Sequence, residues 1–495
     1  MNIASLVRDR ARELPAKPAL VLGAGGGAVT FGALNSEADR VARGLARRGV
    51  EPGDRVAIGM HNVPHFAYAY FGVLRAGAIA VPLNVMLTDR EVATVLADSG
   101  AKVVLAAPPF ADVIERAAQS TPSVHEVIST ESWGDLGVLG ERAEDLDTSD
   151  DDLAVLAYTS GTTGEPKGAM LTHGNLLANL RQQMAIPGAQ VEADDVLLLA
   201  LPLFHIFGLN VTLGLLVMSG ATGVLMERFE PVPALRLIQE HHVTVLFGAP
   251  PMYNALADVP GGEQYDLSRV RLAVSGAAPL AVEVLGRFKE VFGVQIYEGY
   301  GLTETAPTVT SSRLVEEPRP GSVGKVLPGV EMRIVDEDGN DVELGDTGEV
   351  VVRGPNVFKG YWQRPEETAR AFVDGWFRTG DVAVQDEDGH LYLVDRKRDL
   401  IIVSGFNVFP AEVERALLEN PKVSDAAVVG VPHQYTGEAV KAYVVLKAGA
   451  AATERELIGD TWARLARFKC PESIEIVDSL PHLLTGKVLR RALRT

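Results

Sequence analysis

The sequence predicts an α/β fold built on parallel sheets, followed by a smaller α+β region. Strand-like apolar runs alternate with segments of helical spacing through the first 300 residues, which is typical of parallel sheets covered by helices. Short strands separated by glycines dominate from about residue 320, and a compact α+β pattern follows residue 398. A chain of 495 residues is too long for one ordinary core. We therefore expect two domains, residues 1–397 and 398–495.

The first elements follow from periodicity. Residues 1–14 mix charged and apolar positions and predict an amphipathic helix rather than a secretory signal. We expect strands at 54–58, 101–106, 153–158, 243–247, 272–275 and 294–297, and helices at 66–75 and 89–98. Residues 196–226 contain no Asp, Glu, Lys or Arg and are long enough to span a membrane. Pro202, Asn210 and several glycines interrupt them, so we expect a buried strand, a loop and a core helix.

The later elements are shorter. Strands at 332–335, 348–353 and 391–394 predict an antiparallel or barrel-like portion. The last region should contain strands at 423–429 and 440–446.

Composition limits the partners and the compartment. The net charge of −19, from 46 basic and 65 acidic residues, argues against a nucleic-acid backbone as partner. The single cysteine, Cys470, cannot form an intramolecular disulfide, which fits a reducing compartment. We therefore expect a cytoplasmic protein without a transmembrane segment, and leave peripheral membrane contact and homodimerisation open.

The most informative segment is residues 158–168, YTSGTTGEPKG. The ten residues after Tyr158 contain three glycines, four hydroxyl side chains and one lysine. Glycines let backbone N–H groups approach phosphate oxygens, and consecutive N–H groups form an anion-binding nest. The segment is not a Walker A sequence, because Lys167 follows Pro166 rather than glycine. It predicts a polyphosphate-binding loop after a strand; a flexible polar surface loop is the alternative.

Six further segments carry groups that suit a nucleotide site: 204–209 (FHIFGL), 275–279 (SGAAP), 297–304 (YEGYGLTE), 376–381 (WFRTGD), 395–410 and 485–491 (TGKVLRR). Five of the six have an ordinary structural alternative. His205 could be a core histidine, residues 275–279 a tight turn, and residues 297–304 an aromatic and glycine turn with a solvated glutamate. The basic residues at 396–398 and 485–491 could be a surface turn and a solvated tail.

In this order, the seven segments closely resemble the adenylate-forming superfamily, which comprises acyl-CoA synthetases, firefly-type luciferases and the adenylation domains of peptide synthetases. Residues 50–58 and 77–84 extend the resemblance to essentially the whole chain. It implies a large N-terminal domain of two parallel-type βαβ sheets plus a small β-barrel-like part. A small, mobile α+β C-terminal domain would follow, with its hinge at Arg398, where other members carry Asp or Lys.

The resemblance also implies a nucleotide site. Residues 275–279 would line one face of adenine, Tyr300 would stack on the other, and Glu298 would accept from the exocyclic amine. Thr303 would bond the α-phosphate, and Glu304 with Thr162 would hold Mg²⁺. Asp381 and Arg396 would contact ribose or phosphate. The implied nucleotide-binding residues are Thr159, Ser160, Gly161, Thr162, Thr163, Gly164, Lys167, Gly276, Ala277, Ala278, Pro279, Glu298, Gly299, Tyr300, Gly301, Thr303, Asp381 and Arg396.

Two chemical steps follow from the same resemblance. The implied catalytic residues are Lys487, His205, Thr303 and Glu304. His205 would gate or orient the acyl carboxylate, and Lys487 would bridge it to the α-phosphate during adenylate formation. Rotation at the hinge would then replace Lys487 by the loop of Ser404, Gly405 and Phe406, which lines the pantetheine tunnel. The implied cosubstrates and metal are ATP, coenzyme A and Mg²⁺.

The acid is less well defined. Candidate pocket segments at 211–218, 247–253, 302 and 307–310 are apolar and contain no Arg or Lys for a second carboxylate. We therefore expect an ATP-dependent, AMP-forming acid–CoA ligase acting on a hydrophobic acid, with a medium- or long-chain fatty acid favoured by the resemblance of residues 403–410. The alternatives are an aryl-acid ligase of the coumarate or benzoate type, an enzyme that loads a carrier protein, a luciferase-like monooxygenase, and a nucleotide-binding scaffold without turnover.

Overall fold

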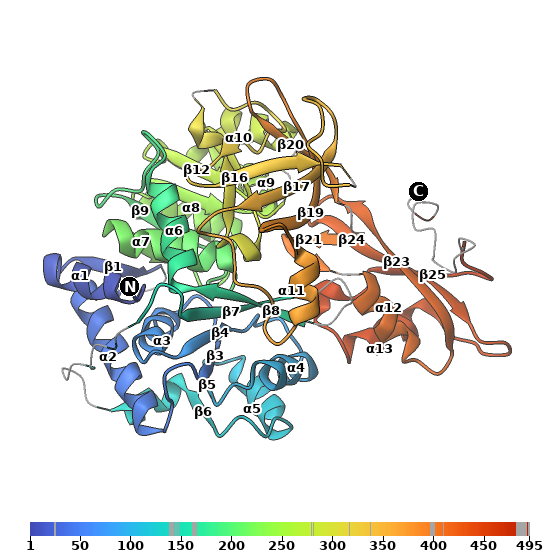
Figure 1. Cartoon of the computed structure of the whole chain (residues 1–495), viewed down its shortest axis with the longest axis horizontal. Helices are drawn as coiled ribbons and strands as arrows, with labels where there is room; N and C mark the ends of the chain where they lie inside the picture. The colour runs from blue at the N-terminus through green and yellow to red at the C-terminus, as the bar shows by residue number, and fades with distance from the viewer. Residues whose placement is uncertain are drawn as a thin grey trace.

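The computed structural model describes residues 1–23, 26–137, 143, 146, 148–160, 166–278, 280, 282–315, 317–336, 338–396, 401–408, 410–481 and 493. Four sheets are arranged along the chain (Figure 1). Two large sheets and a smaller antiparallel sheet pack together, and the C-terminal residues project to one side of them in Figure 1. No helix within the described ranges is both long and apolar enough to cross a membrane.

The first sheet is formed by β3 (Arg55–Gly59), β4 (Ile79–Pro82), β5 (Val103–Ala106), β6 (Glu126–Ser129), β7 (Leu153–Ser160) and β8 (Pro166–Thr172). The strand order is β6-β5-β3-β4-β7-β8, and all neighbours are parallel except β7 and β8. β4 and β5 are buried throughout, as expected for parallel strands covered on both faces. The associated helices are α2 (Phe31–Arg47), α3 (Pro64–Arg75), α4 (Asp89–Ser99) and α5 (Ala111–Gln119).

The second sheet contains β1 (Pro18–Leu22), β2 (Ala28–Thr30), β9 (Val196–Leu199), β10 (Thr222–Leu225), β11 (Val245–Gly248), β12 (Leu272–Ser275), β13 (Ile296–Gly301), β14 (Thr308–Ser311) and β15 (Lys325–Val326). Their order is β15-β14-β13-β12-β11-β9-β10-β1-β2. The strands from β1 to β13 in this order are parallel, and β2, β14 and β15 are antiparallel to their neighbours. The remaining elements of this region are α1 (Ser5–Glu13), α6 (His173–Met184), the π-helix η2 (Phe207–Gly214), α7 (Leu215–Ser219), α8 (Pro231–Glu240), α9 (Pro250–Ala257) and α10 (Val282–Phe292).

The third sheet is antiparallel and comprises β16 (Glu331–Val335), β17 (Gly348–Arg353), β18 (Phe372–Val373), β19 (Trp376–Gln385) and β20 (Leu391–Arg396), with α11 (Pro365–Ala371) before β18. The glycine-punctuated strands predicted after residue 320 form this sheet. Its buried residues, including Val350, Val352 and Phe377, join the hydrophobic core of the two large sheets.

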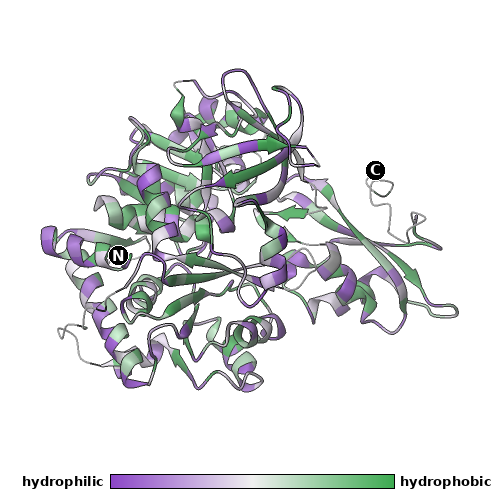
Figure 2. Ribbon diagram, in the orientation of Figure 1, coloured by the Kyte–Doolittle hydropathy of each residue, from purple (hydrophilic) through white to green (hydrophobic). Residues whose placement is uncertain are grey.

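Residues 401–481, which we call the C-terminal part, contain the fourth sheet and a separate hydrophobic cluster. The elements are β21 (Ile401–Val403), β22 (Phe406–Val408), α12 (Pro410–Leu418), β23 (Val423–His433), β24 (Gly437–Leu446), α13 (Glu454–Trp462), the 3-10 turn η6 (Arg467–Lys469) and β25 (Ser473–Ile476). Figure 2 shows apolar colouring along β23 and β24. The domain boundary at residue 398 stays a prediction.

The predicted α/β class is confirmed, and most predicted strands and helices are found within one or two residues. Two local features bear on the site. The segment 297–301, for which an aromatic and glycine turn was the alternative, lies inside β13. The loop at 161–165 lies outside the described residues, and it is followed by the antiparallel strand β8 rather than by the helix of a Walker A motif. Residues 196–226 form β9, η2, α7 and β10, so they contain one more strand than predicted.

Candidate active site

A cavity of about 460 Å³ lies at the carboxyl ends of the parallel strands β11, β12 and β13. This is where ligands bind in open α/β sheets, because the loops that follow the strands converge there. The cavity brings together residues from six of the seven predicted segments. The predicted site residues in its lining are Thr159, Lys167, His205, Gly276, Ala277, Gly299, Tyr300, Gly301, Thr303, Glu304, Asp381 and Gly405.

The other predicted site residues do not line the first cavity or lie outside the described residues. Glu298 is buried in β13 next to the lining residue Gly299, and Phe406 lines a neighbouring cavity. Ala278 and Ser404 are half-exposed and lie beside lining residues in sequence. Ser160 and Arg396 are described through their strands only. The remaining predicted residues, Gly161, Thr162, Thr163, Gly164, Pro279, Arg398 and Lys487, lie outside the described residues.

Tyr300 and Asp381 join β13 to β19 across the cavity. The Tyr300 hydroxyl donates to Asp381 Oδ2 at 2.8 Å, and both residues are buried. The backbone N–H of Asp381 donates to the Thr379 hydroxyl at 3.1 Å, and this hydrogen bond holds the backbone from which the aspartate side chain extends. A carboxylate held in this way next to an aromatic ring is suited to accept hydrogen bonds from a pair of ribose hydroxyls.

Glu304 and Lys167 both lie beside Tyr361. The Tyr361 hydroxyl donates to Glu304 Oε1 at 2.9 Å, and Lys167 Nζ lies 5.6 Å from the centre of the Tyr361 ring. Lys167 also lies 4.0 Å from Glu367 Oε1. Within the described part of the chain, no three His, Cys, Asp or Glu side chains converge as a metal site. One carboxylate plus the phosphates of a nucleotide is, however, a donor set that suits Mg²⁺.

His205 is buried at the cavity wall, and burial lowers its pKa to about 4. The imidazole is therefore neutral at pH 7. Its Nδ1 accepts from the N–H of Phe207 at 3.3 Å, which assigns the ring proton to Nε2. This tautomer can donate one hydrogen bond to an acyl carboxylate.

Glu298 faces a different environment. Burial raises its pKa to about 7, despite a hydrogen bond from the N–H of Leu280 at 3.4 Å. The backbone N–H of Glu298 donates to the Ser312 hydroxyl at 2.7 Å. Its carboxyl group is therefore close to half-ionised at neutral pH, and it can accept or donate a hydrogen bond.

A second cavity of about 500 Å³ continues from the first toward the C-terminal part. Thr159, His205, Ile206 and Thr303 line both cavities. Charged side chains of both signs line the second one. The cations are Arg90, Arg364, Arg415, Arg464 and Lys469, and the carboxylates Glu91, Asp98, Glu412 and Glu419 pair with most of them. The rings of Phe406 and Phe468 lie 5.0 Å apart in its wall.

Gly405 lies in the turn between β21 and β22 and reaches the first cavity from the C-terminal part. Its φ of +82° favours glycine. A Cβ at this position would contact Ala249 at 3.7 Å, so a methyl group would fit while a longer side chain would project toward the cavity region.

The sequence motifs missed several lining residues. Tyr361 orders Glu304, Arg378 pairs with the buried Glu349, and Gln183 and Arg313 line one end of the cavity. Tyr361, Gln183 and Glu349 carry no local signal in the sequence. Arg313 follows closely after the candidate pocket segment 307–310, so the cavity contains an arginine that the candidate segments themselves do not.

Comparison with known proteins agrees with this geometry. The family described as AMP-binding enzyme matches residues 7–362, and the AMP-binding enzyme C-terminal domain matches residues 412–487. The chain belongs to the AMP-binding enzyme family. A long-chain-fatty-acid–CoA ligase of Bacillus subtilis is 35% identical, covering 99% of this chain and 94% of the relative. A feruloyl-CoA synthase of an Amycolatopsis species is 40% identical, covering 95% and 94%.

Two solved structures of similar proteins add to this. This AMP-binding enzyme superposes with a TM-score of 0.88 on a variant of o-succinylbenzoate CoA synthetase from Bacillus subtilis bound to a product analogue, at 33% identity and with 99% and 97% of the chains covered. The TM-score is 0.74 for ATP-bound MatB from Rhodopseudomonas palustris, at 36% identity and with 100% and 98% covered. The predicted superfamily, the class of AMP-forming acid–thiol ligase, and the use of ATP and CoA are confirmed. The roles of individual site residues stay predictions.

Proposed function

We propose that this AMP-forming acid–CoA ligase activates a carboxylic acid with a hydrophobic body as its adenylate and then transfers the acyl group to the thiol of CoA. One observation carries the proposal: the predicted nucleotide and carboxylate residues line one cavity, which joins a second cavity at His205 and Thr303. The first cavity would hold the acid and AMP, and the second would admit the thiol arm of CoA.

For adenylate formation, the chain must bring two anions together. Lys167, the neutral His205 and the loop at 159–164 would offset the repulsion between the acid and ATP. Mg²⁺, held by Glu304 and the predicted ligand Thr162, would supply positive charge to the phosphates when bound. Asp381 and Tyr300 would fix the nucleoside, so that the acid oxygen lies in line with the departing pyrophosphate.

For thioester formation, the thiol must reach the acyl carbonyl as AMP leaves. Gly405 lies at the cavity wall in this structure, which is the position implied for the second step. The higher TM-score with the enzyme bound to a CoA product analogue supports this assignment, because a different placement of the C-terminal domain lowers a whole-chain TM-score. We propose that Lys487 occupies the site in the other arrangement, after rotation at Arg398.

The body of the acid would lie against apolar residues of the lining, including Phe207, Val211, Phe247 and Pro307. Both fatty acids and aryl acids fit this description, and the relatives named above include one of each kind. Activation of either gives AMP, pyrophosphate and an acyl-CoA.

The test is AMP release from ATP with and without CoA, across acids from acetate to palmitate plus benzoate and coumarate. CoA-dependent AMP release with one class of acid would establish the ligase and name its substrate class. Pyrophosphate exchange without stimulation by CoA would instead favour an enzyme that loads a carrier protein. Absence of both reactions with every acid would contradict the proposal.

A further inference from the structure

One end of the first cavity is polar and positively charged. β14 pairs antiparallel with β13, so that Ser311 lies opposite Gly299, and the chain then continues to Arg313. β13 runs in the other direction, toward Thr303 and Glu304. Ser311 and Arg313 therefore lie at the end of the cavity remote from the reacting groups, where the C-terminal end of α6 adds Gln183.

The contacts of Arg313 are all with neutral acceptors. Its Nε donates to the Ser311 hydroxyl at 3.0 Å, Nη1 donates to the Ala189 carbonyl at 3.3 Å, and Nη2 donates to Gln183 Oε1. Since a guanidinium has five N–H groups, two remain for another acceptor. The amide nitrogen of Gln183 likewise has no acceptor among the described residues.

Arg313 is 6% exposed, and burial alone lowers its pKa to about 10. It is therefore still a cation at neutral pH. A buried charge is costly unless an opposite charge or several hydrogen bonds compensate it. Within the described residues, no carboxylate compensates this one.

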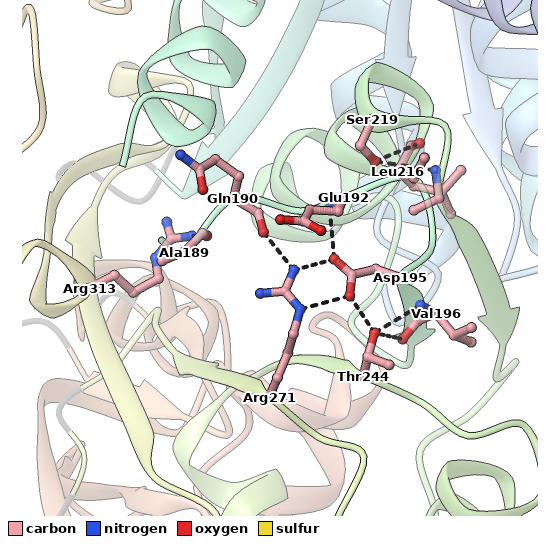
Figure 3. A network of polar contacts seen from close by, with 12 residues as sticks. Ala189, Gln190, Glu192, Asp195, Val196, Leu216, Ser219, Thr244, Arg271 and Arg313 are labelled. Carbon is pink, nitrogen blue, oxygen red and sulfur yellow. Dashed lines mark hydrogen bonds and ion pairs between the residues drawn. The ribbon is translucent and has the colours of Figure 1, made fainter. Parts of the chain in front are cut away.

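The partners of Arg271 differ from those of Arg313 (Figure 3). It lies near Arg313 in the same region, but its Nε donates to Asp195 Oδ1 at 2.9 Å and its Nη2 donates to Gln190 O at 2.7 Å. Arg271 does not line the cavity. Arg271, which lies outside the cavity, is thus paired with a carboxylate, whereas Arg313, which lines the cavity, has only neutral partners among the described residues.

From this arrangement we infer that Arg313 and Gln183 recognise an oxygen acceptor at the far end of the acid, and that the substrate is an oxygen-substituted aryl acid rather than an unsubstituted alkyl acid. This inference rests on the proposed function and narrows its substrate class. The acceptor is a phenolic hydroxyl or a second carboxylate on the ring, opposite the reacting side chain.

The walls between the two ends suit a flat body. The rings of Phe207 and Phe247 meet edge to face with centroids 6.3 Å apart, an arrangement that also offers contacts to an aromatic ligand. On the β13 side, a Cβ added at Gly299 would lie 3.2 Å from the backbone oxygen of Thr310, which is closer than an ordinary van der Waals contact, so this wall of the cavity favours glycine. An alkyl chain would bury the Arg313 cation against methylene groups, which removes water without replacing its hydrogen bonds.

The experiment compares acids that differ only at the far end: cinnamate, 4-hydroxycinnamate and 4-carboxycinnamate, with octanoate and palmitate as alkyl acids. We expect CoA-dependent kcat/KM to be about 10- to 100-fold higher for an oxygen-substituted cinnamate than for cinnamate, as for a hydrogen bond to a charged group. In Arg313→Met this ratio should fall toward one. Comparing 4-hydroxycinnamate with 4-carboxycinnamate shows whether a phenolic hydroxyl or a second carboxylate is recognised.

Three further variants separate recognition from folding. Gln183→Leu should lower the same ratio, and Arg313→Lys should retain part of the preference for 4-carboxycinnamate because it keeps the cation. Arg271→Met is the matched control, since it removes a nearby arginine outside the cavity and should change kcat/KM equally for all acids. The inference is overturned if octanoate or cinnamate is preferred and Arg313→Met leaves the ratio unchanged.

Direct binding distinguishes failure of this inference from failure of the proposed function. The same cinnamates are titrated into wild type and Arg313→Met by calorimetry, without ATP. Selective binding that is lost in Arg313→Met supports the inference even if no acid yields acyl-CoA. Equal binding of cinnamate and its oxygen-substituted forms overturns it.

Discussion

Lys469 Nζ lies 2.9 Å from Glu91 Oε1 and thereby joins the C-terminal part to α4 of the first sheet. The same ammonium group lies 2.8 Å from Glu412 Oε1 on α12, and all three side chains are at most 12% exposed. Burial raises the pKa of Glu412, even though Lys469 opposes the shift. This ion triplet therefore links α4 to the C-terminal part in the structure, in which Gly405 also reaches the cavity.

Lys469→Met should selectively impair thioester formation. Removing the lysine leaves two buried carboxylates close together, which costs about 3–5 kcal/mol in the arrangement that buries them. An arrangement that separates α4 from the C-terminal part would escape this cost. We expect thioester formation from supplied acyl-adenylate to fall by at least about tenfold, and adenylate formation to change much less.

Lys422→Met is the matched control for that variant. Lys422 pairs with Glu456 at 2.6 Å within the C-terminal part, and both side chains are exposed. Loss of such a surface pair should cost at most about 1 kcal/mol and should affect neither step selectively. Equal losses in both steps for Lys469→Met would show that the triplet serves stability alone.

Gly405→Leu should block the second step while sparing the first. The left-handed backbone at Gly405 costs any other residue about 1 kcal/mol, and a leucine side chain would add bulk where the turn reaches the cavity. Single-turnover assays of adenylate formation and of thioester formation measure the two steps separately. Gly405→Ala pays the same backbone cost without the bulk, so it should retain most of the thioester activity.

Lys487→Ala should have the opposite effect, because the superfamily resemblance implies that this lysine acts in the first step. Adenylate formation should then fall by several orders of magnitude, while thioester formation from supplied acyl-adenylate persists. Parallel losses in both steps for Lys487→Ala and Gly405→Leu would contradict the two-arrangement account.

The sequence predicted the parts of the site that depend on local motifs. The apolar run before residue 159 and the glycines of 297–301 are local features, so the strands and many residues that line the cavity could be located from them. Arg313, Gln183 and Tyr361 could not, because their roles depend on the register of β14 against β13 and on how α6 and the loop before α11 pack. The segments predicted for the acyl pocket contain no Arg or Lys, but the cavity that they share also contains Arg313, which is distant from His205 in the chain.

His205→Ala should lower adenylate formation by about tenfold or more, because the variant loses a hydrogen bond to the acyl carboxylate. In wild type, kcat/KM for the acid should show no histidine ionisation between pH 5.5 and 8, since burial lowers the pKa of His205 to about 4. His173 is the control: it is also buried with a pKa near 4, but it accepts from the N–H of Ile3 at 3.3 Å and does not line the cavity. His173→Ala should lower stability without a selective effect on adenylation.

Glu298→Gln should make the protein more stable at alkaline pH. Burial raises the pKa of Glu298 from 4.5 to about 7, so the folded state binds a proton more tightly than the unfolded state does. The stability associated with this proton is complete below pH 4.5 and is lost as the pH rises through 7. At about 1.4 kcal/mol per pKa unit, the loss amounts to roughly 3 kcal/mol above pH 8.

Glutamine keeps the shape and can still accept from the N–H of Leu280, but it does not titrate. Urea unfolding should therefore give similar free energies for wild type and Glu298→Gln at pH 5, and a higher value for the variant at pH 8.5. Because an amide oxygen can also accept from the adenine amine, AMP affinity should be kept in Glu298→Gln and reduced in Glu298→Ala. A stability difference that does not change with pH would show that the Glu298 carboxyl is already ionised in the folded protein at pH 5.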